Sequence, residues 1–130
     1  MILYIESSAA AKLMFDEEES AALKKRLDEL AGDDAVSIVS CTLLETELRR
    51  TAGRVGSPQE LVTDVLDRIE IFDIDRTVFR AAGLLPGVIR SLDALHVAAA
   101  LRIGAHVMVS YDERQLDAAR AAGLHTLSPA

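Results

Sequence analysis

The order of apolar and polar residues along the chain predicts short strands that alternate with helices. Runs of apolar, often β-branched residues predict strands at 2–5, 35–40, 70–75, 105–110 and 125–127. Apolar residues at three- and four-residue spacing predict helices at about 9–15, 20–30, 42–50, 58–69, 78–85, 90–104 and 113–122. This alternation indicates a three-layer α/β/α sandwich with a mainly parallel sheet of four or five strands.

One predicted helix, between Arg90 and Gly104, has an almost wholly apolar body with an acid at its start. Asp93 lies in its first turn, Ser91 can act as its N-cap, and Gly104 suits its C-terminal end. An acid is expected there if the helix end points into a cleft, and the helix dipole favours a carboxylate at that end. Asp93 is therefore a candidate functional acid; simple capping or dipole compensation is the alternative.

Two further acids lie directly after predicted strands. Glu6 ends the first strand and precedes Ser7 and Ser8, while Asp112 follows Ser110 after the fourth strand. Because parallel strands end at the same edge of a sheet, these side chains are expected on one side of the molecule. The serines are expected to cap the next helix and to offer a phosphate site. A solvated Glu6 and a purely capping Asp112 are the structural alternatives.

A fourth acid comes from the helix after the second strand, which contains both Glu45 and Glu47. Two residues correspond to a rotation of about 200° around a helix, so only one of them can join a common site. Arg49 and Arg50 follow in the same helix. They are expected either to compensate the dipole at its C-terminal end or to contact phosphates.

The composition indicates one globular domain spanning residues 1–130. Hydrophobic residues make up 50% of the chain and charged residues 27%, and the formal net charge is −7. The single cysteine excludes a disulfide framework, and no apolar run has the length of a signal peptide or a membrane span, so a cytoplasmic protein is expected. The negative charge argues against nucleic acid as a partner, unless clustered acids bind divalent cations that invert the local field.

Clustered carboxylates define the expected chemistry. Two carboxylates about 4 Å apart repel by roughly 4 kcal/mol at an effective dielectric constant near 20, so a cluster needs cations or protons. Oxygen ligands without a Cys/His set suit Mg²⁺ or Mn²⁺, which activate water and stabilise a phosphodiester transition state. Glycine-rich nucleotide loops, a P-loop, a nucleophile elbow and zinc spacing are all absent. His96, three residues after Asp93, either contacts the site or is a packed, hydrogen-bonded helix histidine.

Four segments, at residues 1–9, 39–50, 90–98 and 109–116, together resemble the PIN-domain ribonucleases, and most closely the VapC toxins of type II toxin–antitoxin systems. The Ser-Leu-Asp-Ala-Leu-His run that includes Asp93 is the most specific of them. The resemblance implies a PIN fold and cleavage of RNA, often tRNA or rRNA, with Mg²⁺ or Mn²⁺. It also implies neutralisation by a VapB-type antitoxin, and assembly as a homodimer or a larger toxin–antitoxin hetero-oligomer.

The resemblance also assigns roles to residues. It selects Glu47 over Glu45, because the family's acid precedes Leu and a basic pair. The resemblance implies four catalytic acids, Glu6, Glu47, Asp93 and Asp112, of which Glu6, Asp93 and Asp112 also bind the metal. It implies contacts to the substrate from Ser7, Ser8, Arg49, Arg50 and Ser110. Ser110 is also expected to hydrogen-bond the groups around the metal.

One position departs from the family. The family's first acid is almost always aspartate, whereas this chain has Glu6. The extra methylene moves the carboxylate by up to about 1.5 Å. Since Mg²⁺ demands near-octahedral geometry, metal affinity and turnover are expected to be lowered. Glu6→Asp is accordingly expected to raise RNA cleavage, or at least not to lower it.

Two other functions compete with a ribonuclease. The first is a catalytically weakened PIN-like module that binds a partner or RNA without cutting, with Glu6 as the sign of that loss. The second is a phosphoacceptor receiver domain, which needs a lysine late in the chain. The only lysines are Lys12, Lys24 and Lys25, so the receiver reading is disfavoured.

Overall fold

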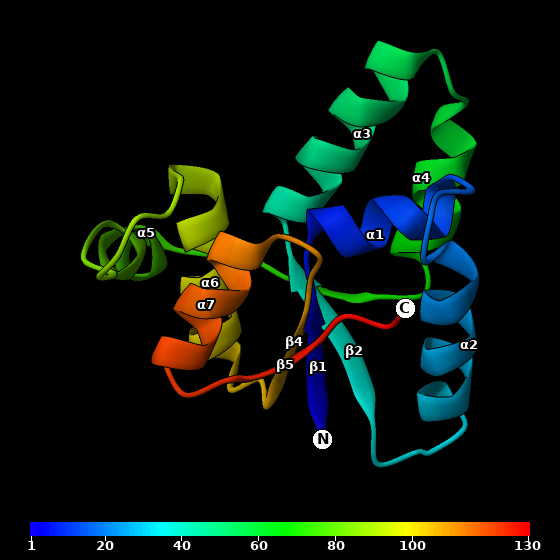
Figure 1. Ribbon diagram of the computed structural model, residues 1–130. Coiled ribbons are helices and arrows are strands. Elements are labelled where there is room, and N and C mark those ends of the chain that lie inside the picture. Colours follow the sequence, from blue (N-terminus) through cyan, green and yellow to red (C-terminus); the bar gives the residue numbers. More distant parts are fainter.

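The computed structural model describes all residues from Met1 to Ala130 and contains five strands and seven helices (Figure 1). The strands are β1 (Ile2–Ile5), β2 (Ser37–Cys41), β3 (Glu70–Phe72), β4 (Val107–Val109) and β5 (His125–Leu127). The helices are α1 (Ser7–Met14), α2 (Ser20–Ala31), α3 (Leu43–Val55), α4 (Gln59–Leu66), α5 (Arg76–Gly83), α6 (Ser91–Ile103) and α7 (Glu113–Ala121). The predicted order of strands and helices is confirmed throughout.

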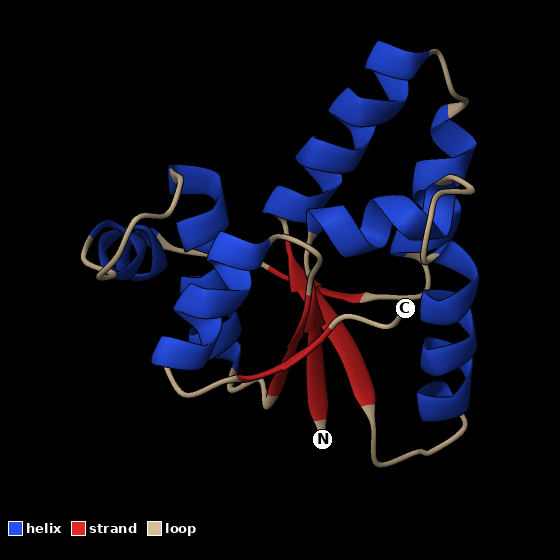
Figure 2. Cartoon of the chain, viewed as in Figure 1, coloured by secondary structure: helices blue, strands red, loops and turns tan.

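The five strands form one parallel sheet in the order β3-β2-β1-β4-β5. Side chains of β1 alternate between its two faces. Tyr4 packs with α5, α6 and α7, whereas Leu3 and Ile5 pack with α1 to α4. Figure 2 shows the sheet between these two helix layers. The expected three-layer α/β/α sandwich is therefore confirmed, and β1 is its central strand.

The ends of several elements differ from the predictions, and the differences matter for the site. Helix α1 begins at Ser7 with Glu6 as its N-cap, and α6 begins at Ser91 with Arg90 at the N-cap position. Ser91 is therefore not the cap. Helix α3 continues to Val55 and ends at Gly56, which has a positive φ of 73°. The predicted strand at 70–75 is shorter, because Asp75 caps α5 instead.

The sheet brings the starts of several helices to one edge. Strands β1, β2 and β4 lie side by side and run in the same direction, so α1, α3 and α7 all begin beyond the same ends of these strands. In Figure 1 this edge faces the top of the view, with α3 on one side and α6 and α7 on the other. No helix has both the length and the apolar character needed to cross a membrane.

Candidate functional site

Glu6 lies where β1 passes into α1, and its side chain is turned back onto the start of that helix. Its Oε1 accepts hydrogen bonds from the backbone N–H of Ala9, at 3.0 Å, and from the Ser8 hydroxyl. The residue is only 3% exposed, and this burial raises the pKa of its carboxyl above the usual range, against the opposing effect of the Ser8 hydrogen bonds. Glu6, rather than Ser7 or Ser8, is thus the N-cap, and the capping prediction for the serines is wrong.

Glu47, in the second turn of α3, faces the same edge of the sheet. Its Oε1 accepts a hydrogen bond from the Ser7 hydroxyl at 2.6 Å and lies 2.5 Å from Nε2 of His96. Glu45 points elsewhere, because its carboxylate pairs with Arg49 at 2.7 Å on the exposed side of α3. Only one of the two glutamates is therefore at the common edge, as their helical spacing required.

His96 is completely buried and uses both nitrogens of its ring. Nδ1 lies 2.7 Å from the Tyr4 hydroxyl, which donates its own proton to Sγ of Cys41 at 3.2 Å. Nε2 donates to the Glu47 carboxylate, which can only accept, and a ring that carries both protons would also donate from Nδ1 to Tyr4. Burial alone lowers the pKa of His96, but the hydrogen bonds and charges of Cys41 and Glu47 outweigh it and raise the pKa to about 9. The predicted alternatives for His96 are both realised: it is packed in the core and it touches the site.

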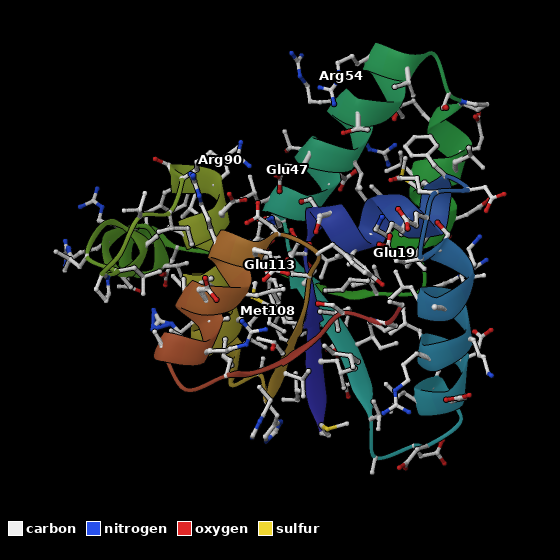
Figure 3. The ribbon with its side chains drawn as sticks, viewed as in Figure 1. Glu19, Glu47, Arg54, Arg90, Met108 and Glu113 are labelled. Atoms are coloured by element: carbon white, nitrogen blue, oxygen red, sulfur yellow. The ribbon has the colours of Figure 1, made fainter.

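Asp93 and Asp112 are joined by one guanidinium group. Nε of Arg90 lies 3.2 Å from Oδ2 of Asp93, and Nη2 of Arg90 lies 3.6 Å from Oδ2 of Asp112. Figure 3 shows Arg90 on the side of α6 and Glu47 at the base of α3, at the same edge of the sheet. Arg90 was not among the residues expected at the site; its position three residues before Asp93, about one helical turn away, was the available signal.

Asp112 is held in place by its neighbours in β4 and α7. It caps α7 by accepting a hydrogen bond from the backbone N–H of Gln115 at 3.0 Å, while its own N–H donates to the Ser110 hydroxyl at 3.1 Å. The buried side chain of Gln115 accepts from Ser110 and donates to the backbone oxygen of Asp93. Ser110 has no exposed surface, and in this structure it supports Asp112. Gln115 had no sequence signal beyond its place in the first turn of α7.

Ser8 connects the ends of β1 and β4, which are neighbours in the sheet. Its hydroxyl donates to Glu6 and accepts from the backbone N–H of Tyr111 at 3.0 Å, next to Asp112. Since Ser7 is bonded to Glu47, both serine hydroxyls hold carboxylates in this structure. They support the acids, and neither points a free hydroxyl at a phosphate site.

The arginines of α3 lie differently from the predictions. Because α3 extends to Val55, Arg49 and Arg50 lie in the middle of the helix. Arg54, in the last turn, is the basic residue that can compensate the helix dipole at the C-terminal end. Arg49 holds α3 against α4 through Gln59, at 3.2 Å, and Thr63, at 3.3 Å. Arg49 is thus committed to a structural contact, whereas Arg50 is exposed and makes no ion pair.

The chemistry of these acids fits a hard divalent cation, although they do not form a closed cage. Glu6, Asp93 and Asp112 offer only oxygen ligands from neighbouring elements, which Mg²⁺ and Mn²⁺ prefer. In this structure the Arg90 guanidinium is the positive charge that lies beside both Asp93 and Asp112. No three His, Cys, Asp or Glu side chains are arranged to hold a metal ion, since each acid is turned toward a protein partner.

Comparison with known proteins gives a consistent picture. The PIN domain family matches residues 3–121. Ribonuclease VapC47 of Mycobacterium tuberculosis (strain CDC 1551 / Oshkosh) is 35% identical over 133 residues, covering 98% of this chain and 97% of that protein.

Solved structures share the fold at lower identity. VapBC2 from Rickettsia felis, bound to a DNA fragment from its promoter, has a TM-score of 0.74 at 18% identity, with 98% of both chains covered. Mycobacterium tuberculosis VapC20, described as a sarcin–ricin loop cleaving toxin, has a TM-score of 0.73 at 12% identity, again with 98% of both chains covered.

Proposed function

The chain belongs to the PIN-domain family, among relatives named VapC ribonucleases, and on this basis we propose that it is a Mg²⁺- or Mn²⁺-dependent endoribonuclease toxin. The observation that supports the proposal most is the hydrogen-bonded network at one sheet edge. Ser8 links Glu6 to the backbone N–H of Tyr111, which is next to Asp112. Arg90 joins Asp93 to Asp112. Ser7 holds Glu47.

In the proposed mechanism the chain's own residues bind the cation and orient the reactants. Glu6, Asp93 and Asp112 would hold the divalent ion. When bound, this ion supplies a more acidic water and neutralises charge on the phosphodiester. Glu47 orients the attacking water and accepts its proton, because its Oε2 has no hydrogen-bond partner within the protein. Arg50 and a displaced Arg90 are the cations available to the phosphates, and they replace Arg49 in that role.

The proposed substrate and partners rest on what the relatives are named for. We propose tRNA or rRNA as the substrate class, because a structure of the same fold, VapC20, is described as a sarcin–ricin loop cleaving toxin. A VapB-type antitoxin is the proposed inhibitor, since another neighbour is a VapBC complex. The net charge of −7 favours a partner segment that carries basic residues. A homodimer or a toxin–antitoxin hetero-oligomer is the proposed assembly.

The alternative function, a catalytically weakened module that binds without cutting, is favoured by one observation. Glu6 is 3% exposed and already engaged as a helix cap, so its release toward an ion has a cost that an exposed carboxylate lacks. Cleavage by the purified protein distinguishes the two functions, because the weakened module would bind RNA and leave it intact.

Metal removal is the direct test of the proposed function. Partner-free protein is incubated with total cellular tRNA and rRNA under Mn²⁺, under EDTA, and under EDTA followed by excess Mn²⁺. We expect discrete cleavage products with Mn²⁺, none with EDTA, and recovery on adding the ion back. Glu45→Gln, whose side chain faces away from the site, should cleave like the wild type. Cleavage that persists in EDTA would exclude the metal-dependent mechanism.

Arg90 is expected to compete with the divalent ion for Asp93 and Asp112. Its side chain is 79% exposed, so each ion pair is weak, worth about 0.2–1 kcal/mol. Arg90→Gln should therefore tighten Mn²⁺ binding about two- to fivefold, as measured by calorimetry at low salt. Arg26→Gln, which removes an exposed ion pair on α2, is the control. An unchanged or weaker Mn²⁺ affinity in Arg90→Gln would show that the guanidinium does not occupy the ion's place.

A further inference from the structure

The feature that the proposed mechanism leaves unused is a buried hydrogen-bonded chain that runs from the core to Glu47. Its members are Cys41, Tyr4, His96 and Glu47, joined by successive contacts of 3.2, 2.7 and 2.5 Å. Cys41, Tyr4 and His96 have no exposed surface, while the side chain of Glu47 is 22% exposed. The chain therefore leads from a dry interior to one carboxylate at the edge of the site.

The last two members of this chain, His96 and Glu47, come from different layers of the fold. His96 belongs to α6, in the layer with α5 and α7, whereas Glu47 belongs to α3 on the opposite face of the sheet. Their contact passes beyond the end of β1, where Ser7 also lies 3.2 Å from Nε2 of His96. The imidazole thus ties both helix layers together at the point where the acids gather.

The contact holds one oxygen of Glu47 and leaves the other free. Oε1 receives both the imidazole and the Ser7 hydroxyl, while Oε2 has no partner in the protein. The ring itself cannot turn, because Nδ1 is held by Tyr4 and the two rings pack edge to face with their centroids 5.7 Å apart. A glutamate fixed in this way has lost its rotamer freedom before any substrate binds.

We propose that His96 is a positioning residue that holds Glu47 through Oε1, so that Oε2 is presented to the reacting water, with Tyr4 fixing the imidazole. This inference rests on the proposed ribonuclease function and adds to it a residue that never touches the substrate. The expected loss on removing such a supporting group is about 10–100-fold in activity.

A double-mutant cycle tests the proposal, since a positioning residue acts only through the group that it holds. The variants are His96→Gln, Glu47→Gln and the double substitution, and His125→Gln, at an exposed histidine of β5, is the control. We expect His96→Gln to lower kcat by about 10–100-fold in the wild-type background, with little change in KM. In the Glu47→Gln background it should cause no further loss in single-turnover cleavage.

Two measurements separate positioning from structural damage. Mn²⁺ affinity by calorimetry should be unchanged in His96→Gln, since Glu47 is not a proposed ligand of the ion. Tyr4→Phe serves as the second variant if His96→Gln does not fold. It keeps the ring that packs in the core, removes only the hydroxyl on Nδ1, and should lower kcat only when Glu47 is present.

The outcomes distinguish this inference from the proposed function. If the wild type does not cleave RNA with Mn²⁺, the ribonuclease proposal fails and this inference fails with it. If the wild type cleaves but the two substitutions act independently, so that their losses multiply, only the positioning role is overturned.

Discussion

Asp93→Asn is expected to lower Mn²⁺-dependent RNA cleavage by about 10²–10³-fold, because it removes one of the three carboxylate charges proposed to bind the ion. Asp93 lies in the first turn of α6, its side chain is 17% exposed, and its backbone oxygen is held by Gln115. Asparagine has nearly the same shape and can still accept the hydrogen bond from Arg90. The fold should therefore be retained while the affinity for the divalent ion falls.

The measurement pairs cleavage rates with Mn²⁺ calorimetry and melting temperature. Asp117→Asn is the matched control, because this acid on α7 is 75% exposed and paired only with Arg120. It should leave cleavage and Mn²⁺ affinity unchanged. Wild-type cleavage by Asp93→Asn would contradict the proposed site, since no other acid of α6 could replace this carboxylate.

Glu6→Gln is expected to make the metal-free protein more stable and to lower cleavage by about 10²–10³-fold. The glutamine oxygen can still accept from Ala9 and Ser8, so the cap of α1 is kept. What disappears is a carboxylate whose burial penalises its charge. A gain of about 1 kcal/mol corresponds to a rise in Tm of roughly 4 °C for a domain of this size.

The gain in stability should depend on pH in a defined direction. Burial raises the pKa of Glu6 in the folded protein, so the folded state binds this proton more tightly than the unfolded state. Glu6 therefore contributes favourably to the free energy of unfolding at acidic pH. This contribution is lost as the pH rises through the raised pKa of Glu6 in the folded state. The advantage of Glu6→Gln should accordingly be small at low pH and largest at neutral pH, as measured by thermal melts across that range in EDTA.

Divalent ions should reverse the ranking of these proteins. Mn²⁺ binds the ionised carboxylate and should raise the Tm of the wild type, but it should raise that of Glu6→Gln much less. Glu6→Asp keeps the charge and restores the acid usual in the family, so it should cleave at least as fast as the wild type. A clear loss of cleavage in Glu6→Asp, or equal Mn²⁺ stabilisation of Glu6→Gln, would count against Glu6 as a ligand.

Local pattern was sufficient to predict the architecture of this protein. The spacing of apolar residues predicted the correct order of twelve elements, and a parallel sheet implied that Glu6 and Asp112 lie beyond the same ends of their strands, β1 and β4. These features depend on the periodicity of the backbone and on the rules of chain connection, so short stretches of sequence are enough to predict them. The choice between Glu45 and Glu47 needed only the rotation per residue of a helix together with the family resemblance.

Side-chain partners were decided only by the tertiary structure. Glu6 rather than a serine caps α1, Arg49 is drawn to α4, and Arg90 bridges two acids 19 residues apart in sequence. The contact between His96 and Glu47 spans 49 residues and crosses from one helix layer to the other. Such contacts follow from how the two layers pack on the sheet, because that packing sets which buried polar groups can satisfy one another.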